Sequence, residues 1–172
     1  MVPDLPRVGL VKILFVCLGN ICRSPAAEGV MTKLVTEAGL EQVWEIDSAG
    51  TIGMHAGNPA DVRMQTAARK RGVALTSRAR QIWTADLDRF DLILAMDRSN
   101  FGDIGLLAGK SRRAEVALFC EFCTRHREIE VPDPYYGGPE GFEKVLDLLE
   151  DGCAEILRLW REEKRWNPST NA

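Results

Sequence analysis

The sequence predicts an α/β fold: a three-layer doubly wound domain with a central four-stranded parallel sheet and helices on both faces. Short apolar runs alternate with helical patterns along the chain, which is typical of parallel βαβ units. The 172 residues are 45% apolar, enough for one sizeable core. No internal repeat or linker divides the sequence, so we expect a single domain over residues 1–172. Its core should span about residues 8–165, with flexible ends at 1–7 and 166–172.

Each element is expected from its apolar pattern. The strands are predicted at residues 8–16, 43–47, 91–96 and 115–119, where apolar residues run almost without interruption. A helix should follow the first strand and end at Gly39, and a second should run from Asn58-Pro59 to Gly72. Residues 99–108 read as a third helix. Residues 139–165 give the clearest pattern, with apolar residues at a period of 3.6 from Phe142 to Trp160.

The join between the first strand and the first helix is the most informative stretch, Cys17-Leu18-Gly19-Asn20-Ile21-Cys22-Arg23-Ser24-Pro25. A buried strand here turns through a glycine-containing loop into a helix start. At such a junction backbone N–H groups point inward and the helix N-terminus adds partial positive charge, so it binds anions. A cysteine packed in the core at the end of a strand, in an ordinary strand–loop–helix join, would not explain why Cys17 and Arg23 bracket this loop. We therefore interpret the loop as a phosphate site with a nucleophile at its floor.

The residue types suit that chemistry. The amides of Leu18 to Arg23 and the Arg23 guanidinium favour the thiolate form of Cys17, and the planar guanidinium matches two phosphate oxygens. Gly19 permits close backbone approach, and Asn20 tolerates the left-handed region. Ser24 is expected to cap the helix or to donate to the Cys17 thiolate. The loop is not a Walker A motif, which requires Gly-Lys-Ser/Thr.

A second segment, Asp133-Pro134-Tyr135-Tyr136-Gly137, carries one carboxyl and two aromatic rings in a turn-rich stretch. Proline holds the preceding Asp133 in an extended conformation. A carboxylic acid beside Cys17 would protonate the leaving oxygen and later accept a proton from water. Spacing alone does not separate Asp133 from Asp97 or Asp103 in this role. Tyr135 and Tyr136, with Leu18, are candidate crevice walls.

These motifs resemble the low-molecular-weight protein tyrosine phosphatases, whose signature is Cys-x5-Arg-Ser near the N-terminus and Asp-Pro-Tyr-Tyr near the C-terminus. Similar stretches occur at Asp47–Thr51, Gly57–Pro59, Ala79–Ile82 and Met96–Asn100, so the resemblance covers about residues 8–165. It implies a metal-independent hydrolase that forms a cysteinyl-phosphate on phosphotyrosine. Cys17 would be the nucleophile, Arg23 the phosphate-binding arginine and Asp133 the acid and base, with no cofactor.

The resemblance also suggests which residues surround the substrate. Leu18, Gly19, Asn20, Ile21, Cys22 and Ser24 form the phosphate loop. The position that usually holds a crevice aromatic carries Met54 or His55. A histidine that supports the loop asparagine in many members is replaced by Ser77 or Arg78, while Ser48 is expected to support Asn20. Ile21 is like the residue in tyrosine-directed members, whereas relatives that act on phosphoarginine carry threonine there.

Other functions remain as alternatives on the same loop: a thioredoxin-linked arsenate reductase, a phosphoarginine phosphatase, or an idle phosphotyrosine-binding module. The reductase needs two further cysteines, and its relatives have a cysteine where this chain has Asp97. The binding module would lack the nucleophile or the acid.

The remaining features bound the partners. A net charge of −3 gives no basic footprint, so nucleic acid is not an expected partner. No apolar run is long enough to span a membrane, residues 1–7 do not resemble a signal sequence, and five cysteines are an odd count. We therefore expect a cytoplasmic protein. We also expect it to be a monomer. Its partners would be phosphotyrosine proteins or small aryl phosphates, with phosphate-like oxyanions as inhibitors.

Two cysteine groups allow more than one interpretation. Cys22 either forms a reversible disulfide with Cys17 or packs as a thiol. Cys120, Cys123 and His126 have zinc-type spacing without a clear fourth ligand, and core thiols are the favoured reading.

Overall fold

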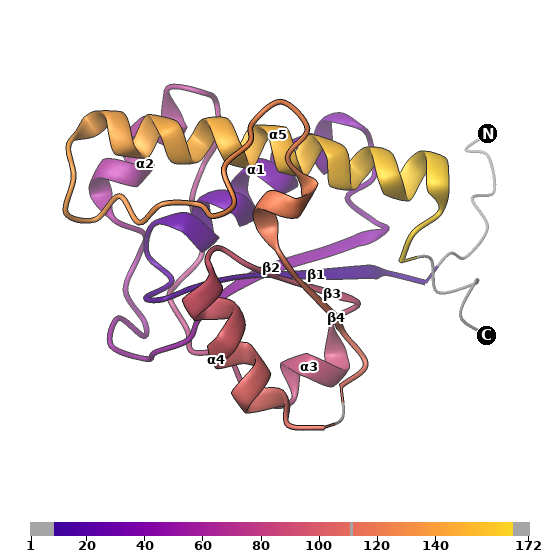
Figure 1. Ribbon diagram of the computed structural model, residues 1–172. Coiled ribbons are helices and arrows are strands. Elements are labelled where there is room, and N and C mark those ends of the chain that lie inside the picture. The colour runs from indigo at the N-terminus through magenta and orange to yellow at the C-terminus, as the bar shows by residue number, and fades with distance from the viewer. Residues whose placement is uncertain (1–8, 111, 167–172) are drawn as a thin grey trace.

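The computed structural model describes residues 9–110 and 112–166 and consists of a parallel sheet between two layers of helices (Figure 1). The strands are β1 (Val11–Cys17), β2 (Trp44–Gly50), β3 (Leu92–Ala95) and β4 (Glu115–Leu118). The helices are α1 (Arg23–Glu37), α2 (Val62–Arg69), α3 (Asp86–Arg89), α4 (Arg98–Ala108) and α5 (Pro139–Glu163), with a 3₁₀ turn η1 (Phe119–Phe122). The predicted three-layer α/β fold is therefore confirmed.

The sheet has the strand order β2-β1-β3-β4, and every neighbouring pair is parallel. The chain leaves β1 for β2 on one side and then crosses to β3 on the other side. The carboxyl ends of β1 and β3 are thus the switch point of the sheet, where ligands of doubly wound folds bind. Cys17 ends β1 and pairs with Gly50 at the end of β2.

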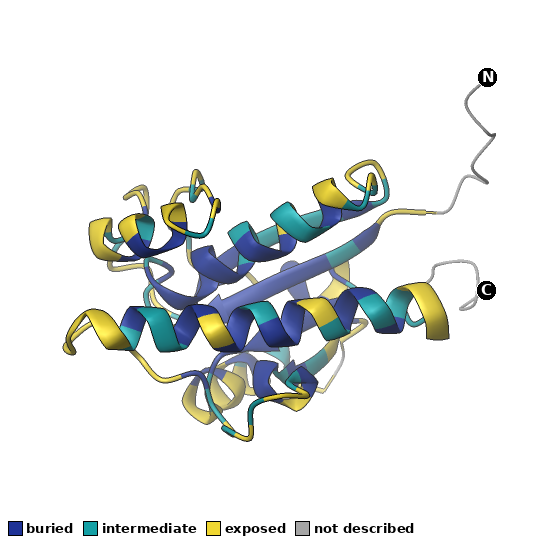
Figure 2. Ribbon diagram, turned by 90° about the horizontal axis from the view of Figure 1, so that it is seen from above, coloured by how far each residue is buried: buried dark blue, intermediate teal, exposed yellow. Residues whose placement is uncertain are grey.

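Two cores cover the two faces of the sheet. Alternate β1 residues Ile13 and Phe15 face α1, α2 and α5, whereas Leu14 and Val16 pack with Leu87 and with residues of α4. Because β1 is buried on both faces from Ile13 onward, its sequence there is continuously apolar rather than alternating. On α1 and α5 the buried residues face the sheet and the exposed residues face outward (Figure 2). No helix in the described part of the chain is long and apolar enough to span a membrane.

Several element boundaries differ from the prediction. The first helix begins at Arg23 with Cys22 as its N-cap residue and no side-chain cap, so the expectation that Ser24 caps this helix was wrong. The second helix begins at Val62, because Asp61 caps it by accepting from the Arg63 amide at 2.9 Å, and not at Asn58-Pro59. Strand β2 continues past Asp47 to Gly50, where its polar and small residues hide the strand pattern.

Two short elements were not predicted. Helix α3 has four residues, too few for a periodic pattern, and η1 is apolar enough to read as the end of a strand. The expected flexible ends lie almost wholly outside the described residues. Trp166, placed in one of those ends, packs on Phe122 with 5.9 Å between ring centroids and donates to Glu115 at 2.8 Å.

Candidate active site

The thiol of Cys17 lies at the end of the central strand, under the loop that joins β1 to α1. Its Sγ is 3.0 Å from the Ser24 hydroxyl oxygen, and the Asn20 amide donates to it at 3.3 Å. Cys17 is only 3% exposed, yet it lines a surface cavity. The sulfur is therefore held by the Asn20 amide and by its contact with Ser24, at the border of the space that a ligand would fill.

Asn20 holds the loop in shape. Its φ of 55° lies in the left-handed region, as expected from the sequence. Its side-chain amide donates to the hydroxyls of Ser24 at 2.8 Å and Ser48 at 2.9 Å, and its carbonyl oxygen accepts from the Arg80 amide at 2.9 Å. These three hydrogen bonds fix the Asn20 side chain. Through it the loop is joined to β2 at Ser48 and to the segment before α3 at Arg80.

The Asn20 network continues to a partly buried carboxyl group, that of Glu28. Ser48 donates to Glu28 at 2.6 Å, and burial raises the pKa of Glu28 above its ordinary value although hydrogen bonds from Ser48 and Ser77 lower it. Ser48 thus supports Asn20 directly. Ser77 acts one step further away, through Glu28, a carboxyl group that the sequence analysis did not predict in this network.

The guanidinium of Arg23 is 3% exposed and is oriented by acceptors from two segments, one after β3 and one before α5. Its Nη1 donates to Asp97 at 2.7 Å and to the Val131 carbonyl at 3.0 Å, and its Nη2 lies 3.6 Å from Asp133 Oδ2. Asp97 follows β3 and also caps α4 by accepting from the Asn100 amide at 2.8 Å. Spacing did not distinguish Asp97 from Asp133, but geometry does: Asp97 fixes the arginine, while Asp133 lines the cavity.

The cavity above Cys17 has a volume of about 250 Å³, and we call it the crevice. It brings together most of the predicted site. Its lining comprises Cys17, Leu18, Gly19, Ile21, Cys22, Arg23, Ile52, Met54, His55, Asp133, Tyr135 and Tyr136. Asn20 and Ser24 lie beneath the loop as supports. Both predicted candidates for the missing aromatic wall, Met54 and His55, line it, and Ile52 joins them unpredicted.

The Asp133 segment is a short turn on the rim of the crevice. Asp133 Oδ1 accepts from the Tyr135 amide at 3.1 Å, and the rings of Tyr135 and Tyr136 pack edge to face at 4.9 Å. Arg63 of α2 donates to the Tyr135 carbonyl at 3.0 Å. The aspartate and the aromatic walls are therefore tied to α2, a contact that joins residues 72 positions apart.

The other cysteines occupy different surroundings, and all five are free thiols. Burial raises the pKa of Cys22 to about 12, so this neighbour of the crevice stays protonated. Cys120 and Cys123 pack in the core beside α5. His126 Nδ1 pairs with Asp151 at 2.9 Å, and residues 9–110 and 112–166 contain no group of three side chains placed to hold a metal ion. The zinc interpretation is accordingly not supported among these residues.

A thiol beneath a pocket of this size, facing an arginine and a carboxyl group, defines the class of enzyme that passes a phosphoryl group through a cysteine. Comparisons with known proteins agree. A family model described as low molecular weight phosphotyrosine protein phosphatase matches residues 12–165. The chain belongs to this family, whose members hydrolyse phosphoric monoesters.

Individual relatives cover nearly the whole chain. A putative low molecular weight protein-tyrosine-phosphatase of Synechocystis is 48% identical over 149 residues, 86% of this chain and 94% of that protein. The crystal structure of a protein tyrosine phosphatase from Entamoeba histolytica superposes with a TM-score of 0.86 at 42% identity, covering 90% of this chain and 99% of that one. A Drosophila arginine phosphatase shares the fold at 29% identity, with a TM-score of 0.84 over 89% and 99% of the two chains.

Proposed function

We propose that this protein tyrosine phosphatase works through a cysteinyl-phosphate at Cys17, with Asp133 as acid and then base. In the first step the Cys17 thiolate attacks phosphorus in line with the ester oxygen. The S–P bond forms, the P–O bond breaks, and Asp133 gives its proton to the departing phenolate oxygen. Arg23 and the loop amides bind the equatorial oxygens as their charge develops.

The second step reverses the roles. Water attacks the cysteinyl-phosphate, the Asp133 carboxylate takes its proton, and the S–P bond breaks to release inorganic phosphate and the thiolate. The Ser24 hydroxyl, 3.0 Å from Sγ, donates to the sulfur as negative charge returns to it. Every role is filled by a side chain or amide of this chain, so we expect full activity in EDTA and inhibition by phosphate-like oxyanions.

One observation carries the proposal: Cys17 and Arg23, at the two ends of the loop that joins β1 to α1, line one crevice with Asp133, which comes from a distant segment. Nothing in packing alone requires a buried arginine to meet a thiol and a carboxyl group at the same surface.

The test is Cys17→Ser. Steady-state hydrolysis of p-nitrophenyl phosphate should fall to background while inorganic phosphate still binds, measured by titration calorimetry. Rapid quench of the wild type should give a burst of acid-precipitable phosphate on the protein. Full turnover by Cys17→Ser would refute the assignment of the nucleophile.

Phosphotyrosine is the proposed substrate class, because the crevice has apolar and aromatic walls and Ile21 lines it where the phosphoarginine-directed relatives have threonine. Kinetics on matched phosphotyrosine, phosphoserine and phosphoarginine peptides distinguish the classes, and a preference for phosphoarginine would reverse this proposal. An arsenate reductase would need relay cysteines, but Cys120 and Cys123 pack beside α5 and do not line the crevice.

We further propose that the protein acts in the cytoplasm as a monomer. Five free thiols suit a reducing compartment, and the Cys17 chemistry requires one thiol to stay reduced. Light scattering after size exclusion should give a mass near 19.1 kDa, and a concentration-independent dimer would contradict the monomer.

A further inference from the structure

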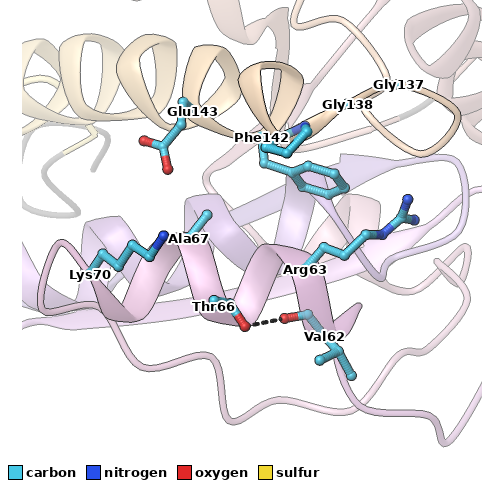
Figure 3. A pocket seen from close by; sticks show the side chains of 10 residues that line it. Val62, Arg63, Thr66, Ala67, Lys70, Gly137, Gly138, Phe142 and Glu143 are labelled. Atoms are coloured by element: carbon cyan, nitrogen blue, oxygen red, sulfur yellow. Dashed lines mark hydrogen bonds between the residues drawn. The ribbon is translucent and has the colours of Figure 1, made fainter.

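A second cavity of about 350 Å³ lies beside the crevice, between α2 and the start of α5 (Figure 3). We call it the α2–α5 pocket. It is lined by Val62, Arg63, Thr66, Ala67, Lys70, Gly137, Gly138, Pro139, Phe142 and Glu143. None of these residues has a role in the proposed phosphoryl transfer.

The α2–α5 pocket is chemically apolar. Val62 is 73% exposed at its mouth, and the ring of Phe142 and the methyl of Ala67 face the space between the helices (Figure 3). Two of its polar side chains are engaged elsewhere: Thr66 donates to the Val62 carbonyl at 2.9 Å, and Glu143 pairs with Arg71 of the segment after α2. An apolar side chain would therefore lose little by entering, whereas a polar one would find few partners.

The pocket is separated from the substrate crevice by one residue, Arg63, and by the turn that follows Asp133. Arg63 donates to the Tyr135 carbonyl, and its Cζ lies 5.2 Å from the centre of the Tyr135 ring and 4.9 Å from that of Phe142. Tyr135 and Tyr136 line the crevice, while the next three residues, 137–139, line the pocket. A single turn of the chain thus lies between the substrate crevice and the α2–α5 pocket.

We propose that the α2–α5 pocket binds a leucine or phenylalanine side chain of the phosphotyrosyl protein, a few residues from the phosphotyrosine in the crevice. This rests on the proposed function. Tyr136, which is 94% exposed, lies on the rim of the crevice next to the pocket-lining residues 137–139, and an extended polypeptide that leaves the crevice over it advances about 3.3 Å per residue. A side chain two to five residues away therefore reaches the neighbouring opening. Binding there adds affinity remote from phosphorus, which raises kcat/KM for proteins but not for small aryl phosphates.

The experiment uses a set of phosphotyrosyl peptides in which one leucine is moved through five positions on each side, in a glycine–serine background. Wild-type kcat/KM should peak at one or two neighbouring positions, about tenfold above the leucine-free peptide, which corresponds to about 1.4 kcal/mol. Thr66→Trp, which fills the pocket from the exposed side of α2, should flatten the profile. Thr76→Trp, the same change at an exposed threonine outside the pocket, should retain the peak.

Hydrolysis of p-nitrophenyl phosphate, which does not extend to the pocket, serves as the check on folding and on the proposed function. If Thr66→Trp loses this activity, Val62→Asp is the second pocket variant. The fold should tolerate it, because position 62 is exposed and acidic residues suit the first turn of a helix. Its carboxylate should weaken the binding of an apolar side chain in the pocket. A flat wild-type profile, or a peak that survives both pocket variants, overturns the pocket assignment. Failure of the wild type to hydrolyse any phosphotyrosine would instead overturn the proposed function.

Discussion

At the scale of single residues, two carboxyl groups approach the same arginine for different purposes. Asp97 is bonded to Arg23 Nη1 at 2.7 Å and has its other oxygen on the Asn100 amide. Asp133 lies 3.6 Å from Nη2 on the rim of the crevice, with one oxygen on the Tyr135 amide. The first is fixed by two segments, and the second lies where a leaving oxygen would emerge.

Asp133→Asn should lower kcat about 100-fold, a usual contribution of general acid catalysis, with KM changed little. The loss should be larger for phenyl phosphate than for p-nitrophenyl phosphate, because the poorer leaving group needs the proton more. Steady-state kinetics on both substrates measure this. Asp103→Asn, an exposed position of α4, is the matched control, and an equal loss there would remove Asp133 from its role.

Asp97→Asn keeps the helix cap but takes the negative charge from Arg23. We expect kcat/KM to fall about tenfold, with the same factor for phenyl and p-nitrophenyl phosphate, because the arginine is disordered and the acid is untouched. A leaving-group-dependent loss in this variant would mean that Asp97 is the proton donor instead.

The residue types of the loop and one of its supports, Ser48, were predictable, but its other partners were not. Cys17, Arg23 and the left-handed Asn20 follow from one short stretch in which each type has few other uses. The Val131 carbonyl and Glu28 were missed because a backbone carbonyl has no sequence signal, and a lone glutamate on an amphipathic helix reads as a surface residue. Both groups also contact residues that are distant from them in the sequence.

At the scale of elements, the loop and the end of β2 are in close contact. Gly50 pairs with Cys17, and a Cβ at position 50 would lie 2.7 Å from the Leu18 carbonyl oxygen and 3.1 Å from the Asn20 amide. Both neighbours are backbone atoms of the phosphate loop, so they have no side-chain freedom with which to move aside.

Gly50→Ala should therefore displace the loop and lower kcat/KM for p-nitrophenyl phosphate by at least tenfold, since small misplacements of reacting groups are costly. Gly102→Ala on α4, where a Cβ meets nothing within 4 Å, is the control and should leave kinetics unchanged. Equal activity of the two variants would show that the loop tolerates the shift.

The sequence predicted α5 and the four-residue strands β3 and β4 closely, but it missed α3 and misplaced the start of α2 and the end of β2. α5, with 25 residues of regular apolar spacing, was predicted within two residues of its observed end. α2 was started four residues early, because Asn58-Pro59 resembles a helix start while the true cap, Asp61, follows it. Tertiary pairing also decides strands: β2 reaches Gly50 because β1 is beside it, which no local pattern reveals.

At the scale of the whole molecule, Asp151 of α5 holds the segment that follows η1. It is buried and accepts from the amides of Thr124, Arg125 and His126 and from the His126 ring. Burial raises its pKa, but the hydrogen bond from His126 and those from the three amides outweigh burial and hold the pKa well below the ordinary 3.8. The ionised carboxylate therefore joins the last helix to a segment about 25 residues earlier.

A depressed pKa in the folded state means that this stabilisation is complete above about pH 4 and is lost as the pH falls below it. We expect Asp151→Asn to lose about 1–3 kcal/mol at pH 7 and to show a shallower fall of stability below pH 4 than the wild type. Urea unfolding at several pH values measures both. Asp147→Asn, half exposed on the same helix, is the control, and a wild-type acid slope in Asp151→Asn would contradict the assignment.

The direction of the strands has a practical consequence. β1 begins at the end of the sheet opposite Cys17. The chain after α5 returns to that same end, where Trp166 donates to Glu115 at the start of β4. The first and last residues that the structure describes, 9 and 166, thus lie on the side away from the crevice, and an affinity handle placed beyond them should leave the opening free. Immobilised on beads through such a handle, the inactive Cys17→Ser protein would present its opening to a cell extract and serve as bait for its own targets.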